Sequence, residues 1–104
     1  MFKAIILLTR RDGTSHAEFA AWWLERHAPL ARQLPGCRRL VFNLVEPDAA
    51  GSNAVDGISE LWFDSREAFD AAYATDLGRQ VTADTLANVG ARTRLFVDEV
   101  VELE

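Results

Sequence analysis

The stretch FKAIILLT, residues 2–9, carries apolar side chains on both of the faces that a strand presents. Successive side chains of a strand point to opposite sides of its sheet. One side of this strand would hold Phe2, Ala4, Ile6 and Leu8, and the other Ile5 and Leu7. Residues 37–46, CRRLVFNLVE, repeat the pattern with Leu40, Phe42 and Leu44 against Val41 and Val45. A sheet built from such strands needs cover on both faces.

Turn and capping residues divide the rest of the chain. An Asp-Gly turn follows the first strand, and the capping box of Ser15 and Glu18 predicts a helix that Gly36 closes. Further predicted elements are strands at 37–46 and 55–63 around a loop at 47–54, helices at 66–73 and 76–89, and a last strand over 91–103. This β-α-β-β-α-β order predicts one α+β domain, residues 1–104, with a ferredoxin-like four-stranded antiparallel sheet and its helices on one face.

The sheet face without helices is predicted to bind a second copy of the chain. Each strand would leave two or three apolar side chains on that face, and each is worth about 1.5–3 kcal/mol when fully buried. A second sheet laid over the first removes this penalty. We therefore expect a homodimer, a dimeric α+β barrel with its helices outside.

Composition excludes several classes of partner. The formal net charge of −5 argues against nucleic acid and anionic lipid, since both require clustered Lys and Arg. The apolar run at residues 4–8 is far shorter than the roughly 20 residues of a membrane span. Cys37 is the single cysteine and has no internal disulfide partner, which fits a reducing compartment. We expect a cytoplasmic protein that binds neither nucleic acid nor membrane.

The helix at 16–35 carries an inward histidine. Phe19 and Trp23 lie within about 60° of Leu30 and Leu34 on a helical wheel, and His27 lies only about 20° beyond that stripe. Trp22 falls on the far flank, which predicts a boundary position. Pro29 lacks an N–H and disfavours helix before it, so a kink or restart is expected near residue 28.

Two interpretations of His27 stay open. It donates a hydrogen bond to a carbonyl freed by the break, or it serves a small cavity as general acid, general base or ligand-orienting donor. His16 lies 11 residues, about 16 Å, along the helix and cannot share a metal ion with it. Neither a zinc-ligand spacing nor a glycine-rich phosphate loop is present, so no metal and no cofactor is predicted.

Polar and aromatic residues of the strands supply further candidates. The amide of Asn43 must face either the dimer interface or a pocket, and Trp62 is a candidate wall of the same cavity as Trp23. Acidic residues also occur in the strands, namely Glu60, Asp98 and Glu99. Paired with Arg39 or Arg94 they would be interface ion pairs, and unpaired in a cleft one of them would be a general base.

These motifs resemble the EthD family of small dimeric α+β-barrel proteins. The resemblance rests on F-x-x-x-W-x-x-x-H-A-P-L, from Phe19 to Leu30, on D-G-I-x-E-L-W-F, from Asp56 to Phe63, and on a later Ala83-Asp84. It implies the ferredoxin-like fold and the sheet-to-sheet dimer, and it places the family histidine at His27. The wider group includes cofactor-free monooxygenases, muconolactone isomerases, polyketide cyclases and dehydratases, and haem-binding enzymes. Here Ala83-Asp84 is followed by TLANVGARTRL, which departs from relatives that continue with acidic and aromatic residues.

The leading functional prediction is a small-molecule enzyme of catabolism or secondary metabolism. It would act without metal or organic cofactor on a hydrophobic, oxygenated substrate, cyclic or aromatic, as an isomerase, a dehydratase or cyclase, or a monooxygenase. His27 would move a proton or polarise a carbonyl, and the substrate would contact Phe19, Trp23, Asn43 and Trp62. The alternatives are a non-catalytic metabolite-binding or accessory protein and, less favoured, haem binding through His27.

Overall fold

A computed structural model of the chain describes residues 1–49 and 53–104. The elements are β1 (Phe2–Arg10), α1 (His16–Ala21), η1 (Trp22–His27), α2 (Ala28–Ala31), β2 (Arg39–Leu44), β3 (Gly57–Phe63), α3 (Arg66–Tyr73), α4 (Asp76–Asn88) and β4 (Val89–Val97). Part of the loop predicted at 47–54, residues 50–52, lies outside the described residues.

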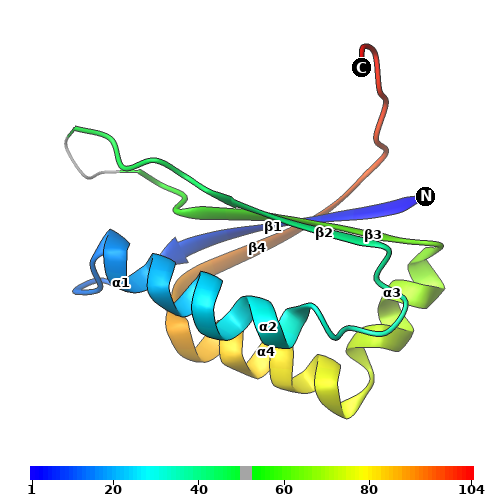
Figure 1. Cartoon of the computed structure of the whole chain (residues 1–104), viewed down its shortest axis with the longest axis horizontal. Coiled ribbons are helices and arrows are strands. Elements are labelled where there is room, and N and C mark those ends of the chain that lie inside the picture. Colours follow the sequence, from blue (N-terminus) through cyan, green and yellow to red (C-terminus); the bar gives the residue numbers. More distant parts are fainter. Residues whose placement is uncertain (50–52) are drawn as a thin grey trace.

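The four strands form one antiparallel sheet in the order β2-β3-β1-β4. All helices lie on one face of this sheet, and the C-terminal segment leaves on the other side (Figure 1). The α+β class and the ferredoxin-like arrangement predicted from the sequence are confirmed. The core lies between the sheet and the helices, where Ala4, Leu8, Leu61 and Phe63 of the strands are at most 2% exposed.

The first helix changes type along its length. After α1 comes the π-helix η1, in which the N–H of Ala28 donates to the carbonyl of Trp23, five residues earlier. The helix then continues without a gap as α2 from Ala28, so its hydrogen-bond type changes just ahead of Pro29 while its backbone stays helical. The prediction that Trp22 lies at a boundary is wrong, since only 6% of it is exposed. Residues five apart are about 140° apart on an α-helix but come to the same side of a π-helix, so η1 turns Trp22 inward beside His27.

The last strand begins and ends earlier than predicted. Helix α4 ends at Asn88, and both Val89 and Gly90 belong to β4, so Gly90 does not end the helix. Gly90 has no room for a side chain, because an added Cβ would lie 2.9 Å from the carbonyl oxygen of Arg10. Val97 pairs with Lys3 at the far end of β1, and residues 98–104 have no strand beside them. The strand predicted through residue 103 is therefore wrong beyond Val97.

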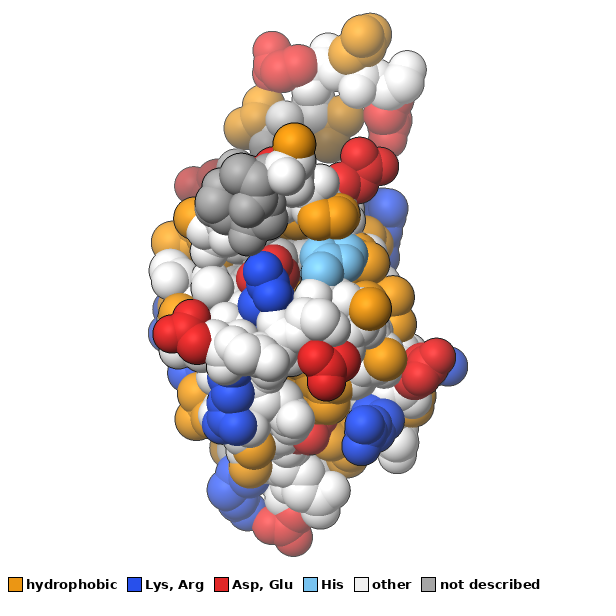
Figure 2. Space-filling model, turned by 90° about the vertical axis from the view of Figure 1, so that its left-hand side faces the viewer, with side chains coloured by type: hydrophobic (Ala, Val, Ile, Leu, Met, Phe, Trp, Pro, Cys, Tyr) orange, Lys and Arg blue, Asp and Glu red, His pale blue; other side chains and the backbone are white. Residues whose placement is uncertain are grey.

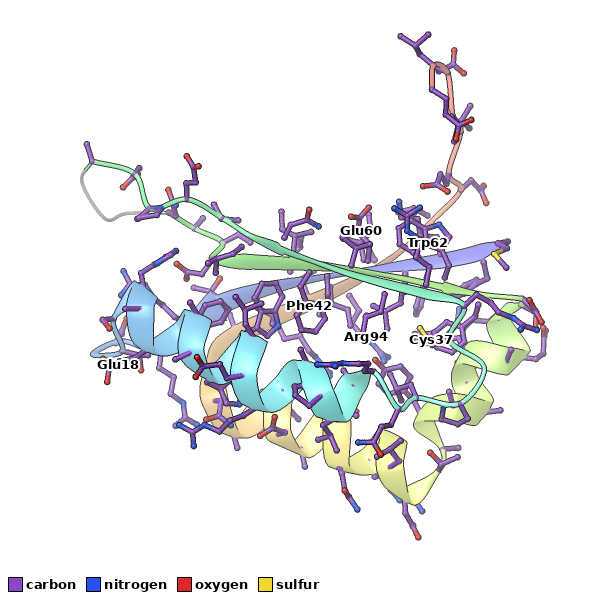
Figure 3. The ribbon with its side chains drawn as sticks, in the orientation of Figure 1. Glu18, Cys37, Phe42, Glu60, Trp62 and Arg94 are labelled. Carbon is purple, nitrogen blue, oxygen red and sulfur yellow. The ribbon has the colours of Figure 1, made fainter. Side chains whose placement is uncertain are left out.

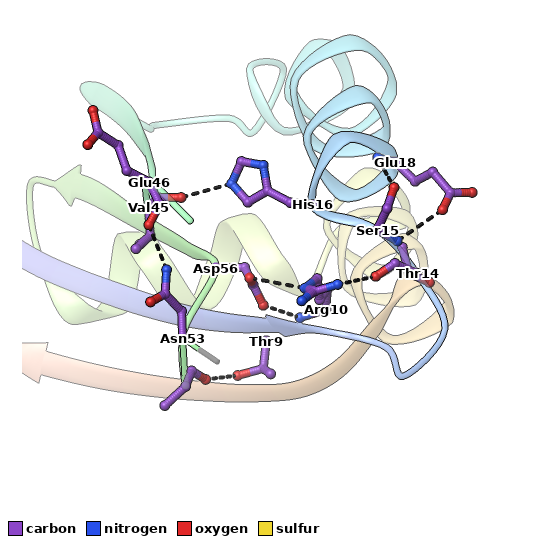
Figure 4. Close-up of polar contacts among 11 residues, drawn as sticks. Thr9, Arg10, Thr14, Ser15, His16, Glu18, Val45, Glu46, Asn53 and Asp56 are labelled. Carbon is purple, nitrogen blue, oxygen red and sulfur yellow. Dashed lines mark hydrogen bonds and ion pairs between the residues drawn. The ribbon is translucent and has the colours of Figure 1, made fainter. Parts of the chain in front are cut away.

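The connection between β1 and α1 is held by polar contacts (Figure 4). Ser15 and Glu18 form the predicted capping box. Nε2 of His16 lies 2.9 Å from the carbonyl oxygen of Val45, so this histidine fastens α1 to the end of β2. Asp56 is 3% exposed and accepts the backbone N–H of Arg10 at 2.8 Å. These contacts keep His16 away from His27, as the helical rise predicts.

The helix-free face carries an ion cluster at its centre. Nζ of Lys3 lies 2.9 Å from Glu60 and 2.8 Å from Glu99, and the indole of Trp62 donates to Glu99 at 3.0 Å. Figure 3 shows Glu60 and Trp62 on the side of the sheet away from the helices. Within the chain the cation that pairs with Glu60 and Glu99 is Lys3, and Arg94 lies on the other face. Arg39 lies over the ring of Trp62 and contributes to the lowered pKa of Glu99. The pairing of these acids across an interface stays a prediction.

This cluster predicts a dependence of stability on acid. Hydrogen bonds from Lys3 lower the pKa of the Glu99 carboxyl, and those from Asn43 and Lys3 lower that of Glu60. A carboxyl whose pKa is lower in the folded than in the unfolded protein stabilises the fold at a pH above the unfolded-state pKa of about 4.3. This stabilisation is lost as the pH falls through the folded-state pKa. We expect the free energy of unfolding to fall from pH 5 to pH 3, and to fall less in Glu99→Gln, measured by urea denaturation. Equal slopes for both proteins would contradict this.

Charges of both signs are interspersed over the end of the molecule that Figure 2 shows. A continuous basic surface of the kind that binds nucleic acid is not present on that face. None of the described helices has the length and apolar character that crossing a bilayer requires.

Candidate functional site

A small cavity lies between the helix side of the sheet and the helices. Its volume is ≈ 20 Å³, which is room for about one ordered water. Most of its lining is apolar, and the polar side chains among the lining residues are His27, Ser59, Tyr73, Thr82, Thr85, Arg92 and Arg94. Each comes from β3, β4, η1, α3 or α4, so the tertiary fold alone brings them together.

His27 has a partner at each ring nitrogen. Its Nδ1 lies 2.7 Å from Oδ2 of Asp84, and its Nε2 lies 3.3 Å from Oγ1 of Thr85. Only 5% of the residue is exposed. Both partners belong to α4, which packs against η1. The histidine therefore does not donate to a carbonyl freed by the helix break, which was one of the two interpretations of the sequence.

Asp84 is itself held in place. Its Oδ1 accepts the indole N–H of Trp22 at 3.4 Å and the side-chain amide of Asn88 at 3.2 Å. The amide of Asn88 also reaches the backbone carbonyl of Asp84 at 2.8 Å. A carboxylate fixed on one oxygen presents the other to His27 in a constant direction. The inward turn of Trp22 thus serves to orient Asp84.

The hydroxyl of Thr85 allows two protonation states of His27. It lies 3.1 Å from the carbonyl oxygen of Val81 as well as 3.3 Å from Nε2. When Nδ1–H donates to Asp84 and the ring is neutral, the Thr85 hydroxyl can donate to Nε2. When the ring is protonated, Nε2–H donates to Thr85, whose own proton turns to Val81. A rotation of one hydroxyl therefore accommodates gain or loss of a proton at Nε2.

Aromatic rings enclose the histidine. The ring of Trp22 lies 4.9 Å from His27 between centroids, and Phe42 stacks on His27 at 6.2 Å and on Trp23 at 4.4 Å. Trp23 is fully buried, and its indole occupies the space that a side chain at Gly57 would need, since an added Cβ would lie 2.8 Å from the ring. Gly57, the glycine of the D-G-I-x-E-L-W-F motif, thus leaves room for Trp23, the tryptophan of the helix motif.

The structure brings together some of the predicted site residues and separates others. His27 and Trp23 line the cavity, and Phe19 lies behind Trp23 with its ring centroid 5.5 Å away. Asn43 and Trp62 lie on the helix-free face instead. Asn43 donates to the carbonyl of Ile58 and to Glu60, and Trp62 donates to Glu99. The placement of Trp62 in the cavity of Trp23 is therefore wrong. Asn43 lies on the face predicted to form the dimer interface and away from the cavity.

Several residues of the site were not predicted. Asp84 had a sequence signal, since it belongs to the Ala83-Asp84 pair of the family pattern, but its distance of 57 residues from His27 hid the contact. Thr85 and Tyr73 carry no motif of their own. An alternating Arg-x-Arg in an apolar strand, as at Arg92 and Arg94, was a signal for two cations on one face.

No metal site was found in the described part of the chain, where no three His, Cys, Asp or Glu side chains are grouped to hold an ion. Haem ligation by His27 meets an obstacle of size. The cavity has room for about one water, far less than a haem group requires. The residues present do not fit a haem group.

Comparison with known proteins gives a consistent match. The model of the EthD domain matches residues 11–88. A crystal structure of an EthD family protein from Bacillus halodurans C-125 superposes with a TM-score of 0.80 at 24% identity, covering 96% of this chain and 100% of that one. A cofactor-independent oxygenase from Streptomyces nogalater gives 0.72 at 15% identity, covering 98% and 95%. A dimeric ferredoxin-like protein from Thermobifida fusca YX gives 0.73 at 17% identity, covering 92% and 88%. No curated protein matches the sequence.

Proposed function

The chain belongs to the EthD family, and from this premise and the geometry around His27 we propose that it is a small-molecule enzyme of catabolism or secondary metabolism. Its substrate is a hydrophobic, oxygenated compound with a cyclic or aromatic skeleton. One observation carries the proposal: a buried imidazole, oriented by a carboxylate, lies at the wall of an apolar cavity. This combination is typical of a general acid or base.

In the proposed mechanism, Nε2 of His27 takes a proton from the substrate, or gives one to it. Asp84 keeps Nδ1 protonated and stabilises the imidazolium that forms, and Thr85 follows the change at Nε2 by turning its hydroxyl. A proton removed beside a carbonyl leaves an enolate, and protonation of its oxygen or of another carbon completes an isomerisation. The apolar walls exclude water from this exchange. The reaction proposed here uses no metal and no organic cofactor.

A substrate larger than a water molecule requires the cavity to open. Leu40 and Phe42 line both the cavity and an open groove of ≈ 250 Å³ on the outside, together with Leu24, Ala28 and Arg32. We propose that movement of the Phe42 ring joins the two spaces. Phe42 is half-buried, and Figure 3 shows it on the helix side of the sheet. We propose this groove as the entrance.

The test is proton exchange on a defined ketone. 2-Tetralone is an aromatic cyclic ketone whose C–H bonds next to the carbonyl exchange slowly with D₂O, and ¹H NMR follows the loss of signal. We expect the protein to accelerate this exchange above the rate in buffer and above that of an equal concentration of free imidazole. A rate equal to that of free imidazole would contradict general-base catalysis at His27.

The small volume of the closed cavity favours a second candidate, a non-catalytic binding or accessory protein. In that case an aromatic ligand binds saturably and leaves unchanged. Saturable binding of 2-tetralone with no accelerated exchange would support this candidate over the enzyme. The cytoplasmic location stays a prediction from the single cysteine.

We further propose that the protein is a homodimer through the helix-free face. The neighbour from Thermobifida fusca is described as dimeric. Apolar side chains on this face are half-buried or exposed, and they are Ile5, Leu7, Val41, Ile58, Leu95 and Val97. This face carries more apolar side chains than a sheet face in contact with water usually does.

Leu95→Glu tests this interface. Leu95 is 44% exposed and lies opposite Ile5, so a carboxylate there would be buried against the second sheet. We expect the wild type to have the mass of a dimer and Leu95→Glu that of a monomer, measured by light scattering after gel filtration. Leu86→Glu, at a 54% exposed position on α4, should stay dimeric. A monomeric wild type, or a dimeric Leu95→Glu, would contradict the proposed face.

A further inference from the structure

Apart from His27, whose charge depends on its protonation, the charged side chains that line the cavity are all cations. Arg92 and Arg94 are among the lining residues, and no Asp or Glu is found among them in the described chain. Neither guanidinium forms an ion pair with a described carboxylate, whereas Lys3, Arg10, Arg38, Arg66 and Arg79 each do. In a protein with a net charge of −5, this is a local excess of positive charge.

The register of the sheet places both guanidinium groups at the same side of the cavity. Arg92 pairs with Leu8 and Arg94 with Ile6, and both partners lie on the helix side of β1. The two arginines are therefore neighbours on one face, with their Cα atoms about 7 Å apart. Because β4 is an edge strand, they reach solvent as well: Arg92 is half-buried and Arg94 exposed. Figure 3 shows Arg94 below the sheet, toward the helices.

Tyr73 adds a neutral donor at this place. It lines the same cavity as the two arginines. Burial raises the pKa of its phenol to about 12, against the opposing effect of Arg94 and Arg92. Both arginines are thus close enough to act on the phenol, which keeps its proton at neutral pH. Two cations and one O–H donor thus line a space that has no Asp or Glu among its described lining residues.

We propose that Arg92, Arg94 and Tyr73 bind a carboxylate group of the substrate, which makes the substrate an aromatic or cyclic acid. Guanidinium groups bind carboxylates through paired N–H donors, and desolvation by the apolar walls strengthens the contact. The acid group is held at the β4 side of the cavity, while the skeleton extends along Phe42 toward His27. This inference rests on the proposed function, since it names the substrate class of the same cavity.

A structural role for Arg94 is the competing explanation. Its guanidinium carbon lies 5.7 Å from the ring centre of Phe69 and 5.9 Å from that of Phe96, distances at which a cation interacts with an aromatic face. That role would affect stability and would not distinguish an acid from its amide. Arg92 has no such ring partner among the described residues, so it separates the two explanations.

The test compares two ligands of the same shape. 2-Naphthoate and 2-naphthamide differ in charge and are not expected to react, and their affinities are measured by ligand-observed NMR titration. We expect wild type to bind 2-naphthoate at least about 10-fold more tightly than the amide. Arg92→Gln combined with Arg94→Gln should weaken 2-naphthoate binding about 10–100-fold and leave amide binding unchanged. The single variant Arg92→Gln should show part of this loss.

Arg26→Gln is the matched control, because Arg26 is exposed on η1 and does not line the cavity. It removes the same charge and should keep the preference for the acid. Equal binding of the two ligands by wild type, no binding of 2-naphthoate, or a preference that survives in the double variant would overturn the carboxylate site. The 2-tetralone assay is independent of it: loss of acid preference with intact exchange leaves the enzyme proposal standing, and the reverse result leaves the carboxylate site standing.

Discussion

His27→Gln is expected to lower the rate of 2-tetralone exchange by about 10²–10⁴-fold, the usual contribution of a positioned general acid or base. Glutamine fills a similar space and keeps hydrogen-bonding groups near Asp84 and Thr85, but it cannot take up a proton at neutral pH. The rate is measured by ¹H NMR under saturating enzyme, with circular dichroism to confirm that the variant is folded. The loss should be in the chemical step, while binding of 2-naphthamide stays within a few fold.

His16→Gln is the control for this result. It makes the same change at the other histidine, whose Nε2 lies beside the carbonyl of Val45, away from the cavity. This variant should keep the wild-type exchange rate. If His27→Gln exchanges 2-tetralone as fast as His16→Gln does, the assignment of His27 as the proton-transfer residue is wrong.

Asp84 acts through His27 and is a positioning residue. Asp84→Asn keeps an oxygen that can face Nδ1–H, but it removes the negative charge that stabilises the imidazolium. Asp84→Asn should therefore lower the rate of 2-tetralone exchange at saturating ketone, while the affinity for 2-naphthamide stays within a few fold. A merely structural Asp84 would change the free energy of unfolding without lowering the exchange rate of the folded variant.

Trp23→Ala is expected to destabilise the fold by about 3–5 kcal/mol, the range for removal of a large buried aromatic side chain. Trp23 is fully buried and stacks on Phe42 with an interplanar angle of 7°. Its removal leaves a void against Gly57, which has no side chain to fill it. Urea denaturation followed by circular dichroism measures the change in the free energy of unfolding.

The neighbouring Leu24 supplies the matched comparison. It is 43% exposed, so Leu24→Ala should cost about 0.5 kcal/mol or less. Trp23→Phe keeps an aromatic ring in the same place and should lie between the two. A Trp23→Ala variant as stable as Leu24→Ala would show that the indole is not part of the core.

Periodicity in the sequence was enough for most elements of the fold. The apolar alternation at residues 2–9 and the capping box of Ser15 and Glu18 are local signals, and the starts of β1 and α1 follow them closely. The end of β4 could not be predicted in this way. Residues 98–103 include the β-branched pair Val100 and Val101, but pairing needs a neighbour, and β1 offers its last partner at Lys3. Strand length is thus set by the adjacent strand as well as by the pattern.

The candidate site likewise has some residues that local spacing predicts and others that only the tertiary structure places. A wheel with 100° per residue predicts that His27 and Trp23 face inward, because both belong to one helix and the rule is local. The same wheel misplaces Trp22, since it assumes an α-helix and η1 is a π-helix. Asn43 and Trp62 were assigned to the cavity or the interface by residue type, and only the register of the sheet decides their face.

The sequence by itself determined the order of the elements, the two apolar faces of the sheet and the inward direction of His27, because each follows from side-chain spacing along a single helix or strand. Only the tertiary structure decided what His27 meets. Asp84 and Thr85 are 57 and 58 residues away, and Arg92 and Arg94 reach the cavity from an edge strand. These contacts depend on packing of α4 and β4 against η1 and the sheet, and such packing has no period in the sequence.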